Sequence, residues 1–392
     1  MNDSALSIEG LFDGGPFPHL QKSLGLFRPV GLNVLARAIF MVLIGWFPLV
    51  ILVLVQSFVD HRVQPSAFLT DFGVYARSLL AVPLFILSES SCLPRLNNVA
   101  HHFVSSGLVA DEDRIKFYNL IMRTRVLINS TVAEVIALVL AYAIVWGVYV
   151  RYLMPGSVPP WYWVVHETNT LSWAGWWYLM ISLPLLLILI YGWLWRVLLW
   201  TRFLFLVSRM KLRYVAAHPD HAAGLKFLNA SLIAFAPIAF TLGIIVAGSV
   251  ANKVHMHQTS LDNVQRTIGA LLGVVLVLFA GPLMIFSLKL YMVKIKGVFS
   301  YGQLANSVGQ EFEEKWLTGY KKTGQHSLEA PDFSATTDLY SVVANVHSAT
   351  VLPFEWRGLI GLVVSTLIPF LPVVLLAIPL KVIIKELANL LL

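Results

Sequence analysis

Long apolar runs alternate with short polar connections along most of this chain. An α-helix rises about 1.5 Å per residue, so about 20 apolar residues cross the hydrocarbon core of a bilayer. Runs of this kind lie at about Val34–Phe58, Phe72–Leu93, Val126–Val150, Trp173–Leu199, Phe227–Ala251, Ile268–Val293 and Leu359–Leu380. Because prolines interrupt the last run, the pattern predicts an all-α protein, a polytopic transmembrane helical bundle of six or seven spans.

The same pattern divides the chain into four parts. They are a cytoplasmic surface segment at 1–33, a bundle of six spans at 34–293, a helical cytoplasmic insert at 294–355, and a final region at 356–392 that ends in an amphipathic tail at Lys381–Leu392. In the insert, Gln303–Leu317 and Thr336–Val351 have the periodicity of amphipathic helices. The final region contains Pro369, Pro372 and Pro379, so its apolar run is either a kinked span or a re-entrant hairpin.

The composition is that of a membrane protein. Of the 392 residues, 57% are hydrophobic and 12% are charged, whereas an ordinary soluble domain carries about 25% charged residues. The net charge of +7 could indicate a nucleic-acid partner. The basic residues cluster at the ends of apolar runs, however, so we expect the lipid bilayer as a partner and no nucleic acid. The single cysteine, Cys92, excludes an intramolecular disulfide and a cysteine-based metal cluster.

The distribution of Lys and Arg predicts the orientation of the chain in the membrane. With a cytoplasmic N-terminus, the inner side receives three of these residues from the N-terminal segment. It receives five, six and seven more from the connections after spans two, four and six, which makes 21 of the 28. The outer side keeps Arg62, Arg77, Arg151, Lys253, Arg266, Lys381 and Lys385. Because cytoplasmic connections are enriched in Lys and Arg, we expect the N-terminus in the cytoplasm.

Four charged residues lie inside or near the ends of predicted spans: Glu89, Glu134, Arg77 and Arg196. A charge at the centre of a bilayer costs about 2.5–3.5 kcal/mol even on insertion scales, so each must face protein, water or a counter-ion. Both glutamates lie towards the cytoplasmic ends of their spans, and Arg196 could pair with either. These residues are therefore candidates for an ion or proton pathway, and structural ion pairs are the alternative.

Small residues recur at helical spacing in the fifth and sixth predicted spans. Gly243, Ala247 and Ala251 follow one another at intervals of four, and Gly269 and Gly273 open the next span. Such spacing allows two helices to approach closely in lipid. It predicts helix packing and does not identify the partner helix.

A cationic stretch, TRFLFLVSRMKLRYVAAHPDHAAGLKFL, follows the fourth predicted span from Thr201 to Leu228. If Arg202 to Arg213 is helical, Arg202, Arg209 and Arg213 fall within about 40° of one another on the helix surface. Such a cytoplasmic stripe suits anions or anionic lipid headgroups. Plain enrichment of positive charge on the inner side explains the same residues without a ligand.

The stretch contains a second candidate site, His218-Pro219-Asp220-His221. Imidazole and carboxylate groups suit zinc, iron or manganese, so His218, Asp220 and His221 could contribute to a metal site. Pro219 prevents a regular helix, however, and three ligands within four residues rarely converge on one ion. We favour a turn in which Asp220 caps the following helix, and we expect no cofactor.

Two stretches resemble conserved blocks of a known family. The sequence from His218 to Leu225, HPDHAAGL, resembles the "HPD…GGL" signature of bacterial multi-spanning membrane proteins with no assigned activity, with Ala223 in place of the first glycine. The stretch from Asp332 to Phe354, which ends in Val351-Leu-Pro353-Phe354, resembles a second block of the same proteins. The resemblance implies a bacterial inner-membrane location and assigns no catalytic residue.

The sequence favours transport over an enzymatic reaction. It contains no GxxxxGK[ST], GxGxxG, HExxH or GxSxG motif, which argues against a primary pump and gives an enzyme no support. The charges within spans and the proline-interrupted last run predict a homo-oligomeric channel or transporter for ions or small solutes. One alternative is a sensor or scaffold whose amphipathic helices recruit a cytoplasmic protein. Another is a membrane-embedded metal-dependent enzyme that uses His218, Asp220 and His221.

Overall fold

A computed structural model describes residue 11 and residues 34–59, 65–152, 160–165, 170–256, 261–318 and 331–377. Within these residues, seven helices are long and apolar enough to cross a membrane. The predicted all-α transmembrane bundle is confirmed, and the chain has the build of an integral membrane protein. The predicted surface segment 1–33, apart from Leu11, and the predicted tail Lys381–Leu392 lie outside the described residues.

Each span is built from one to three helical pieces. The first five spans are α2 (Val34–Gly45) with α3 (Phe47–Val59); α5 (Phe72–Val74), η2 (Tyr75–Ala81) and α6 (Val82–Ser105); α8 (Thr131–Tyr152); α9 (Trp173–Trp177), η5 (Tyr178–Ser182) and α10 (Leu183–Ser208); and η6 (Lys226–Leu228) with α11 (Asn229–His255). The last two are α12 (Leu261–Phe279), and α15 (Trp356–Leu367) with η9 (Ile368–Phe370) and α16 (Leu371–Ala377). These pieces account for all seven predicted spans.

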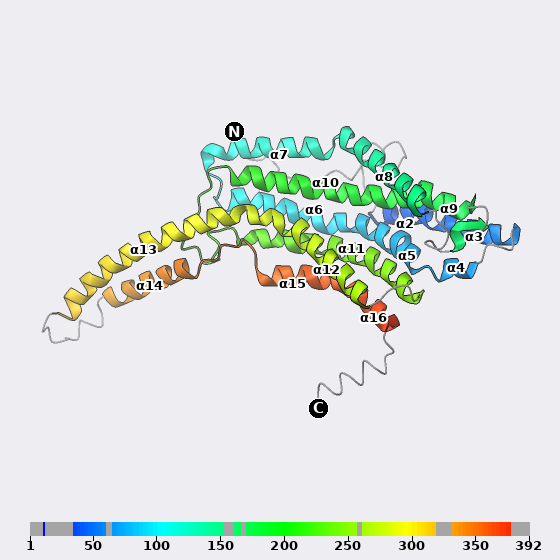
Figure 1. The fold of residues 1–392 in the computed structure, drawn as a ribbon. Coiled ribbons are helices and arrows are strands. Elements are labelled where there is room, and N and C mark those ends of the chain that lie inside the picture. The colour runs from blue at the N-terminus through cyan, green and yellow to red at the C-terminus, as the bar shows by residue number, and fades with distance from the viewer. Residues whose placement is uncertain are drawn as a thin grey trace, which may run out of the picture.

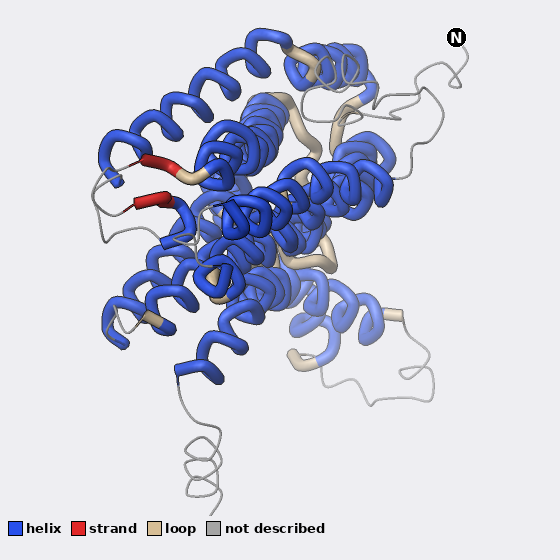
Figure 2. Tube along the Cα trace, turned by 90° about the vertical axis from the view of Figure 1, so that its right-hand side faces the viewer, coloured by secondary structure: helices blue, strands red, loops and turns tan. Residues whose placement is uncertain are grey.

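The connections contain further short elements. They are α4 (Pro65–Leu69), η3 (Asp111–Asp113), α7 (Arg114–Ile128), η4 (Pro160–Tyr162), η7 (Gly281–Phe286), α13 (Ser287–Trp316) and α14 (Asp332–Ser348). Strands β1 (Trp163–Val165) and β2 (Thr170–Leu171) pair antiparallel between spans three and four. Viewed along the helices, the two strands lie at the rim of the bundle (Figure 2).

Prolines determine where the second and fourth spans change their helical geometry. The segments η2 and η5 are π-helical, and Pro83 and Pro184 follow each of them within two residues. A proline has no N–H to donate, so the regular hydrogen-bond ladder is interrupted on its N-terminal side. The N–H of Val82 bonds the carbonyl of Arg77 instead, five residues back, and the N–H of Leu183 bonds that of Tyr178.

The second and fourth spans form the long axis of the molecule. They comprise 34 and 36 residues, and a helix of 36 residues is about 54 Å long, against about 30 Å for the hydrocarbon core. At the left end of Figure 1, α7 packs along α10. The three connections predicted to be cytoplasmic all lie at this end, whereas α3, α4 and α9 lie at the other.

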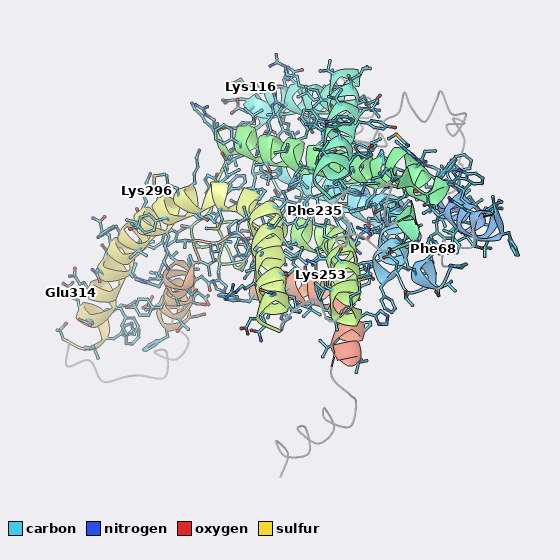
Figure 3. The ribbon with its side chains drawn as sticks, turned by 45° about the vertical axis from the view of Figure 1, so that its right-hand side comes forward. Phe68, Lys116, Phe235, Lys253, Lys296 and Glu314 are labelled. Atoms are coloured by element: carbon cyan, nitrogen blue, oxygen red, sulfur yellow. The ribbon has the colours of Figure 1, made fainter. Side chains whose placement is uncertain are left out.

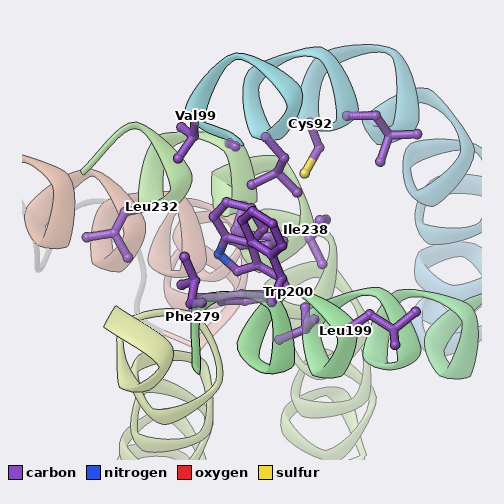
Figure 4. Close-up of a cluster of buried hydrophobic side chains, with 14 of the residues drawn as sticks. Cys92, Val99, Leu199, Trp200, Leu232, Ile238 and Phe279 are labelled. Carbon is purple, nitrogen blue, oxygen red and sulfur yellow. The ribbon is translucent and has the colours of Figure 1, made fainter. Parts of the chain in front are cut away.

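The core of the bundle lies between α6, α10 and α11. Trp200 of α10 is completely buried there, close to Cys92 of α6 and Leu232 of α11 (Figure 4). The rings of Phe235 and Phe279 stack with centroids 4.9 Å apart and bring α12 against α11. In contrast, α8 and α12 are the least buried of the described spans. Their exposed apolar faces are consistent with a lipid environment.

The predicted boundary at residue 293 between bundle and insert does not coincide with the end of a helix. The helix of the sixth span ends at Phe279, and a 3₁₀ turn that contains Pro282 separates it from α13. The break in the helix falls at Gly281-Pro282. After it, α13 runs without interruption through residue 293 to Trp316. The predicted amphipathic helices of the insert form the outer part of α13 and α14.

The helices α13 and α14 form a hairpin that projects from the left end of the bundle (Figure 1). In Figure 3, Lys296 lies on the part of α13 near the bundle and Glu314 lies near its far end. The far end is closed by Phe333, whose ring lies 5.0 Å from that of Phe312 and 5.1 Å from that of Trp316. Lys315 and Trp316 also donate hydrogen bonds to Asp332.

The seventh span is kinked and lies alongside α11. All three of its pieces contact α11, and Phe370 and Val373 pack against Ala247 and Ala251. A re-entrant hairpin would have turned back from α11 after the prolines. Up to Ala377, the structure therefore supports the kinked span of the two predicted alternatives.

The two sets of small residues differ in what they contact. A Cβ atom on Gly243 would overlap the carbonyl oxygen of Thr366 in the seventh span, and one on Gly248 would overlap the Cβ of Ala76. A Cβ atom on Gly269 or Gly273 would meet nothing within 4 Å. The predicted close packing thus exists in the fifth span, whereas the glycines of α12 face away from the rest of the chain.

We expect Gly248→Ala to destabilise the bundle by about 1–3 kcal/mol, because the added methyl group forces α11 away from the second span. Gly269→Ala is the matched control and should be neutral or stabilise α12 by up to about 1 kcal/mol through helix propensity. Unfolding of both variants in detergent micelles measures the difference. Equal destabilisation by the two substitutions would contradict the packing described here.

Candidate functional site

Glu89 lies in the core of the bundle, between two arginines from other spans. Its Oε1 accepts a hydrogen bond from Arg196 Nη2 (3.1 Å), and its Oε2 accepts one from Arg37 Nη1 (3.1 Å). The side chains of Glu89 and Arg196 are only 7% and 2% exposed. Because Arg37 belongs to α2, Glu89 to α6 and Arg196 to α10, this inner network joins the first, second and fourth spans.

Aromatic packing helps to hold the inner network in place. The guanidinium of Arg196 lies over the indole of Trp193, 4.7 Å from the ring centroid. The indole N–H of Trp193 donates to the carbonyl oxygen of Phe85 on α6 (3.0 Å). The first contact lies within α10 and orients Arg196, and the second ties α10 to α6 near Glu89.

A second polar network surrounds Asp71 at the other end of the bundle. The carboxylate of Asp71 is completely buried and caps α5 by accepting the N–H of Val74 (3.0 Å). It also accepts hydrogen bonds from the indole N–H of Trp161 (2.9 Å) and from Asn252 Nδ2 (2.6 Å). The amide oxygen of Asn252 in turn accepts the N–H of Gly73 (3.2 Å). This outer network links the start of the second span and the connection between the third and fourth spans to the end of the fifth span.

Arg77 belongs to the outer network. Its Nε donates to the carbonyl oxygen of Gly73 (3.0 Å), and its guanidinium lies over the ring of Tyr178, 5.6 Å from the centroid. The ring of Tyr162 packs edge-on against Tyr178 at 5.3 Å. Twelve residues separate Arg77 from Glu89, which is about 18 Å along a helix. The two predicted charges of the second span therefore lie at different depths.

Glu134 lies outside the core, in the first turn of α8. It lines a pocket of ≈ 330 Å³ between α8 and α10, together with Arg196 and mainly apolar and aromatic side chains. Arg196 thus faces both this pocket and the inner network. Arg196, Glu89 and Arg37 are joined by hydrogen bonds, and Glu134 lines the same pocket as Arg196, so these four residues form a series of charged groups from the side of the bundle to its core.

The predicted cationic stripe is wrong beyond Ser208. The helix α10 ends there, and the chain turns so that the N–H of Arg213 donates to the carbonyl oxygen of Leu108 (2.8 Å). This pairing next to the Val109–Leu212 bridge replaces the helical hydrogen bonds that the stripe required. Arg202 and Arg209 remain near the end of α10, whereas Arg213 lies near His218.

Asp220 organises the turn that the sequence singled out. Its Oδ1 accepts the N–H groups of Ala222 (2.8 Å) and Gly224 (3.1 Å), and its Oδ2 accepts that of Lys226 (3.0 Å). His218 Nδ1 lies 2.8 Å from Oδ1. Burial raises the pKa of Asp220, but these hydrogen bonds outweigh it and lower the pKa below the ordinary value. The ionised carboxylate therefore stabilises the turn at neutral pH, and this contribution is lost as the pH falls through the lowered pKa.

The backbone of the turn is held in a left-handed conformation. The φ angles are 55° at His221, 53° at Ala223 and 91° at Gly224. Such angles are costly for residues with a Cβ atom, so the hydrogen bonds to Asp220 must offset the strain. The sequence predicted the turn from Pro219 and Asp220, and the structure adds the left-handed residues that close it.

His221 connects the turn to the end of α14. Its Nδ1 lies 2.9 Å from the hydroxyl of Ser348, and its carbonyl oxygen accepts the N–H of Thr350 (2.6 Å). Lys226 Nζ lies 3.4 Å from Glu355, and the N–H of Glu355 donates to the side chain of Asn229 (3.1 Å). The two stretches that carry the family resemblance thus contact one another.

Within the described residues, no group of three or more His, Cys, Asp or Glu side chains could hold a metal ion.

Several residues of the two networks were missed by sequence reasoning. Arg37 was counted with the N-terminal positive charges, although it lies four residues inside the first apolar run. Asp71 was assigned to the end of a connection, and Asn252 lies directly after the predicted fifth span. A polar residue directly before one span and an amide directly after another are the signals that could have identified them. No family model, no curated protein and no solved structure matches the chain.

We expect Glu89→Gln to lower the free energy of unfolding by about 3–5 kcal/mol, because two buried guanidinium groups lose their carboxylate. Asp111→Asn is the matched control, since it removes the partner of Arg114 in an exposed pair and should cost less than about 1 kcal/mol. Denaturant unfolding in micelles measures both. If Glu89→Gln were no more destabilising than the control, the inner network would not hold the spans together.

Proposed function

We propose that the protein is a channel or transporter for ions or small solutes, and that its pathway passes the inner network of Arg37, Glu89 and Arg196. The observation that supports this proposal most is the burial of Glu89 between arginines of two other spans. Charges inside membrane spans are rare and mark ion or substrate pathways. A buried ion pair adds little net stability compared with apolar residues of similar size, so packing alone gives no reason for it.

The helical geometry of the second and fourth spans also supports transport. Each contains a π-helical segment next to a proline, and the two segments meet where Arg77 lies over Tyr178. π-Helical turns occur often at functional sites, and broken helices form the binding sites of many transporters. The spans that carry Glu89 and Arg196 are therefore those with the geometry best suited to a change in conformation.

The pocket between α8 and α10 is proposed as the lateral entrance to this pathway. Glu134 and Arg196 both line it, and Arg196 is hydrogen-bonded to Glu89. An ion or small solute would move from the pocket to the core through this series of polar groups. We further propose a homo-oligomer, because the glycines of α12 face away from the rest of the chain.

A sensor or scaffold is the second candidate. The hairpin of α13 and α14 exposes large apolar side chains, including Phe299 (74% exposed) and Leu304 (49%). Such side chains on a projecting hairpin suit a cytoplasmic protein partner. The third option, an enzyme at His218, Asp220 and His221, has less support, because the oxygens of Asp220 already accept three backbone N–H groups.

Transport is tested by ion and solute flux into liposomes that contain the purified protein. Glu134→Gln and Arg37→Gln each remove one charge at opposite ends of the series, so both should change the flux or its pH dependence while oligomer size stays constant. Arg114→Gln, at an exposed pair on α7, is the control and should leave the flux unchanged. Unaltered flux in both variants would remove these residues from the mechanism, and a parent protein without flux would favour the scaffold.

We also propose a bacterial inner-membrane location with a cytoplasmic N-terminus, supported by the resemblance and by the distribution of Lys and Arg. Ser66 of α4 and Ser307 of α13 are exposed at opposite ends of the molecule, and Cys92 is buried. In intact cells, an impermeant thiol reagent should label Ser66→Cys and should label Ser307→Cys only after lysis. The reverse pattern would contradict the proposed orientation.

A further inference from the structure

A basic pocket lies at the left end of the bundle in Figure 1, where α6 and α10 end and α11 begins. Its volume is ≈ 240 Å³, and it is separate from the pocket between α8 and α10. The polar side chains that line it come from three separate segments: His102 and Ser106 of α6, Arg213 and His218 after α10, and Asp220 and Lys226 before α11.

The charges around the pocket favour an anion. Arg213 and Lys226 carry positive charge at neutral pH, and two imidazoles lie beside them. Asp220 is the only carboxylate among the lining residues, and its oxygens already accept three backbone N–H groups. Lys226 Nζ also lies 3.4 Å from Glu355, at a distance that allows it to bind a further acceptor. Asp220 and Glu355 offset part of this positive charge, whereas Arg213 has no carboxylate within ion-pair distance among the described residues, so an anion is favoured next to Arg213.

The fold places these side chains through contacts that do not use their charged groups. Arg213 is fixed by its backbone N–H, which donates to Leu108, and this leaves the guanidinium available. The ring of His102 packs against Phe227, with centroids 4.4 Å apart. His218 is held by Asp220 through Nδ1, and this leaves Nε2 as its outer ring nitrogen. The positions of these side chains are therefore set by contacts of the backbone and the rings, and the donors come from three separate segments.

We propose that this pocket binds a phosphate group. Arg213 would hold two phosphate oxygens with its planar guanidinium, as arginines do at phosphate sites, and Lys226 would contact a third as a point charge. Donors from several sides suit a tetrahedral anion with several oxygens better than a halide or a single carboxylate. The phosphate belongs either to the headgroup of an anionic phospholipid or to a soluble phosphorylated compound. The proposal does not depend on transport, since binding is measured without flux.

The test uses the full-length purified protein and two probes. Binding of inorganic phosphate and pyrophosphate is measured by calorimetry in neutral detergent. Retention of phosphatidylglycerol, against phosphatidylcholine, is measured by native mass spectrometry after delipidation. We expect Lys226→Gln to weaken binding about tenfold, as the loss of one charge-assisted hydrogen bond does, and Arg213→Gln to weaken it by at least as much because two such bonds are lost. Arg202→Gln and Arg209→Gln are the matched controls, because these exposed arginines lie near the end of α10 and outside the pocket.

Each outcome decides the proposal. Binding of phosphate or pyrophosphate that Arg213→Gln and Lys226→Gln weaken supports a soluble phosphorylated ligand. Retention of phosphatidylglycerol alone, lost in the same variants, supports a lipid headgroup. No binding of any probe to the parent protein would overturn the proposal. Equal weakening by the Arg202 and Arg209 controls would also overturn it, because the effect would then come from the basic surface as a whole. The two pocket variants serve as independent checks if one of them fails to fold.

Discussion

The structure depends on the pairing of charged groups where no water is present to solvate them. In the hydrocarbon core, an unpaired carboxylate or guanidinium is too costly to keep, so each must find its partner within the protein. Glu89 meets this requirement with two arginines, and each arginine lies on a different span. One carboxylate thereby connects the first, second and fourth spans.

Two prolines change the helical geometry of the second and fourth spans, at a different depth from the inner network. Because Pro83 and Pro184 cannot donate a hydrogen bond, the turns before them widen into π-helical segments. The widened turns bring Arg77 over Tyr178, next to the completely buried carboxylate of Asp71. The second and fourth spans are thus tied together twice, by an ion pair towards one end and by an aromatic contact towards the other. Between these two ties, their contact is largely apolar.

Sequence reasoning predicted what depends on local pattern and missed what depends on distant partners. All seven spans and the turn at Asp220 follow from runs of apolar residues and from the chemistry of Pro219 and Asp220. The pairing of Arg37 with Glu89 joins residues 52 positions apart, and that of Asp71 with Asn252 joins residues 181 apart. No periodicity encodes such pairs. The end of α10 at Ser208 was missed for the same reason, since the competing hydrogen bond comes from Leu108.

The contact between the turn at His221 and the end of α14 gives the projecting hairpin a defined connection to the membrane. Thr350 and Ser348 bond to His221, and Glu355 bonds to Asn229 at the start of α11. The chain then enters the seventh span directly, alongside α11. A displacement of the hairpin would therefore act on the fifth and seventh spans together, and also on Lys226 in the basic pocket.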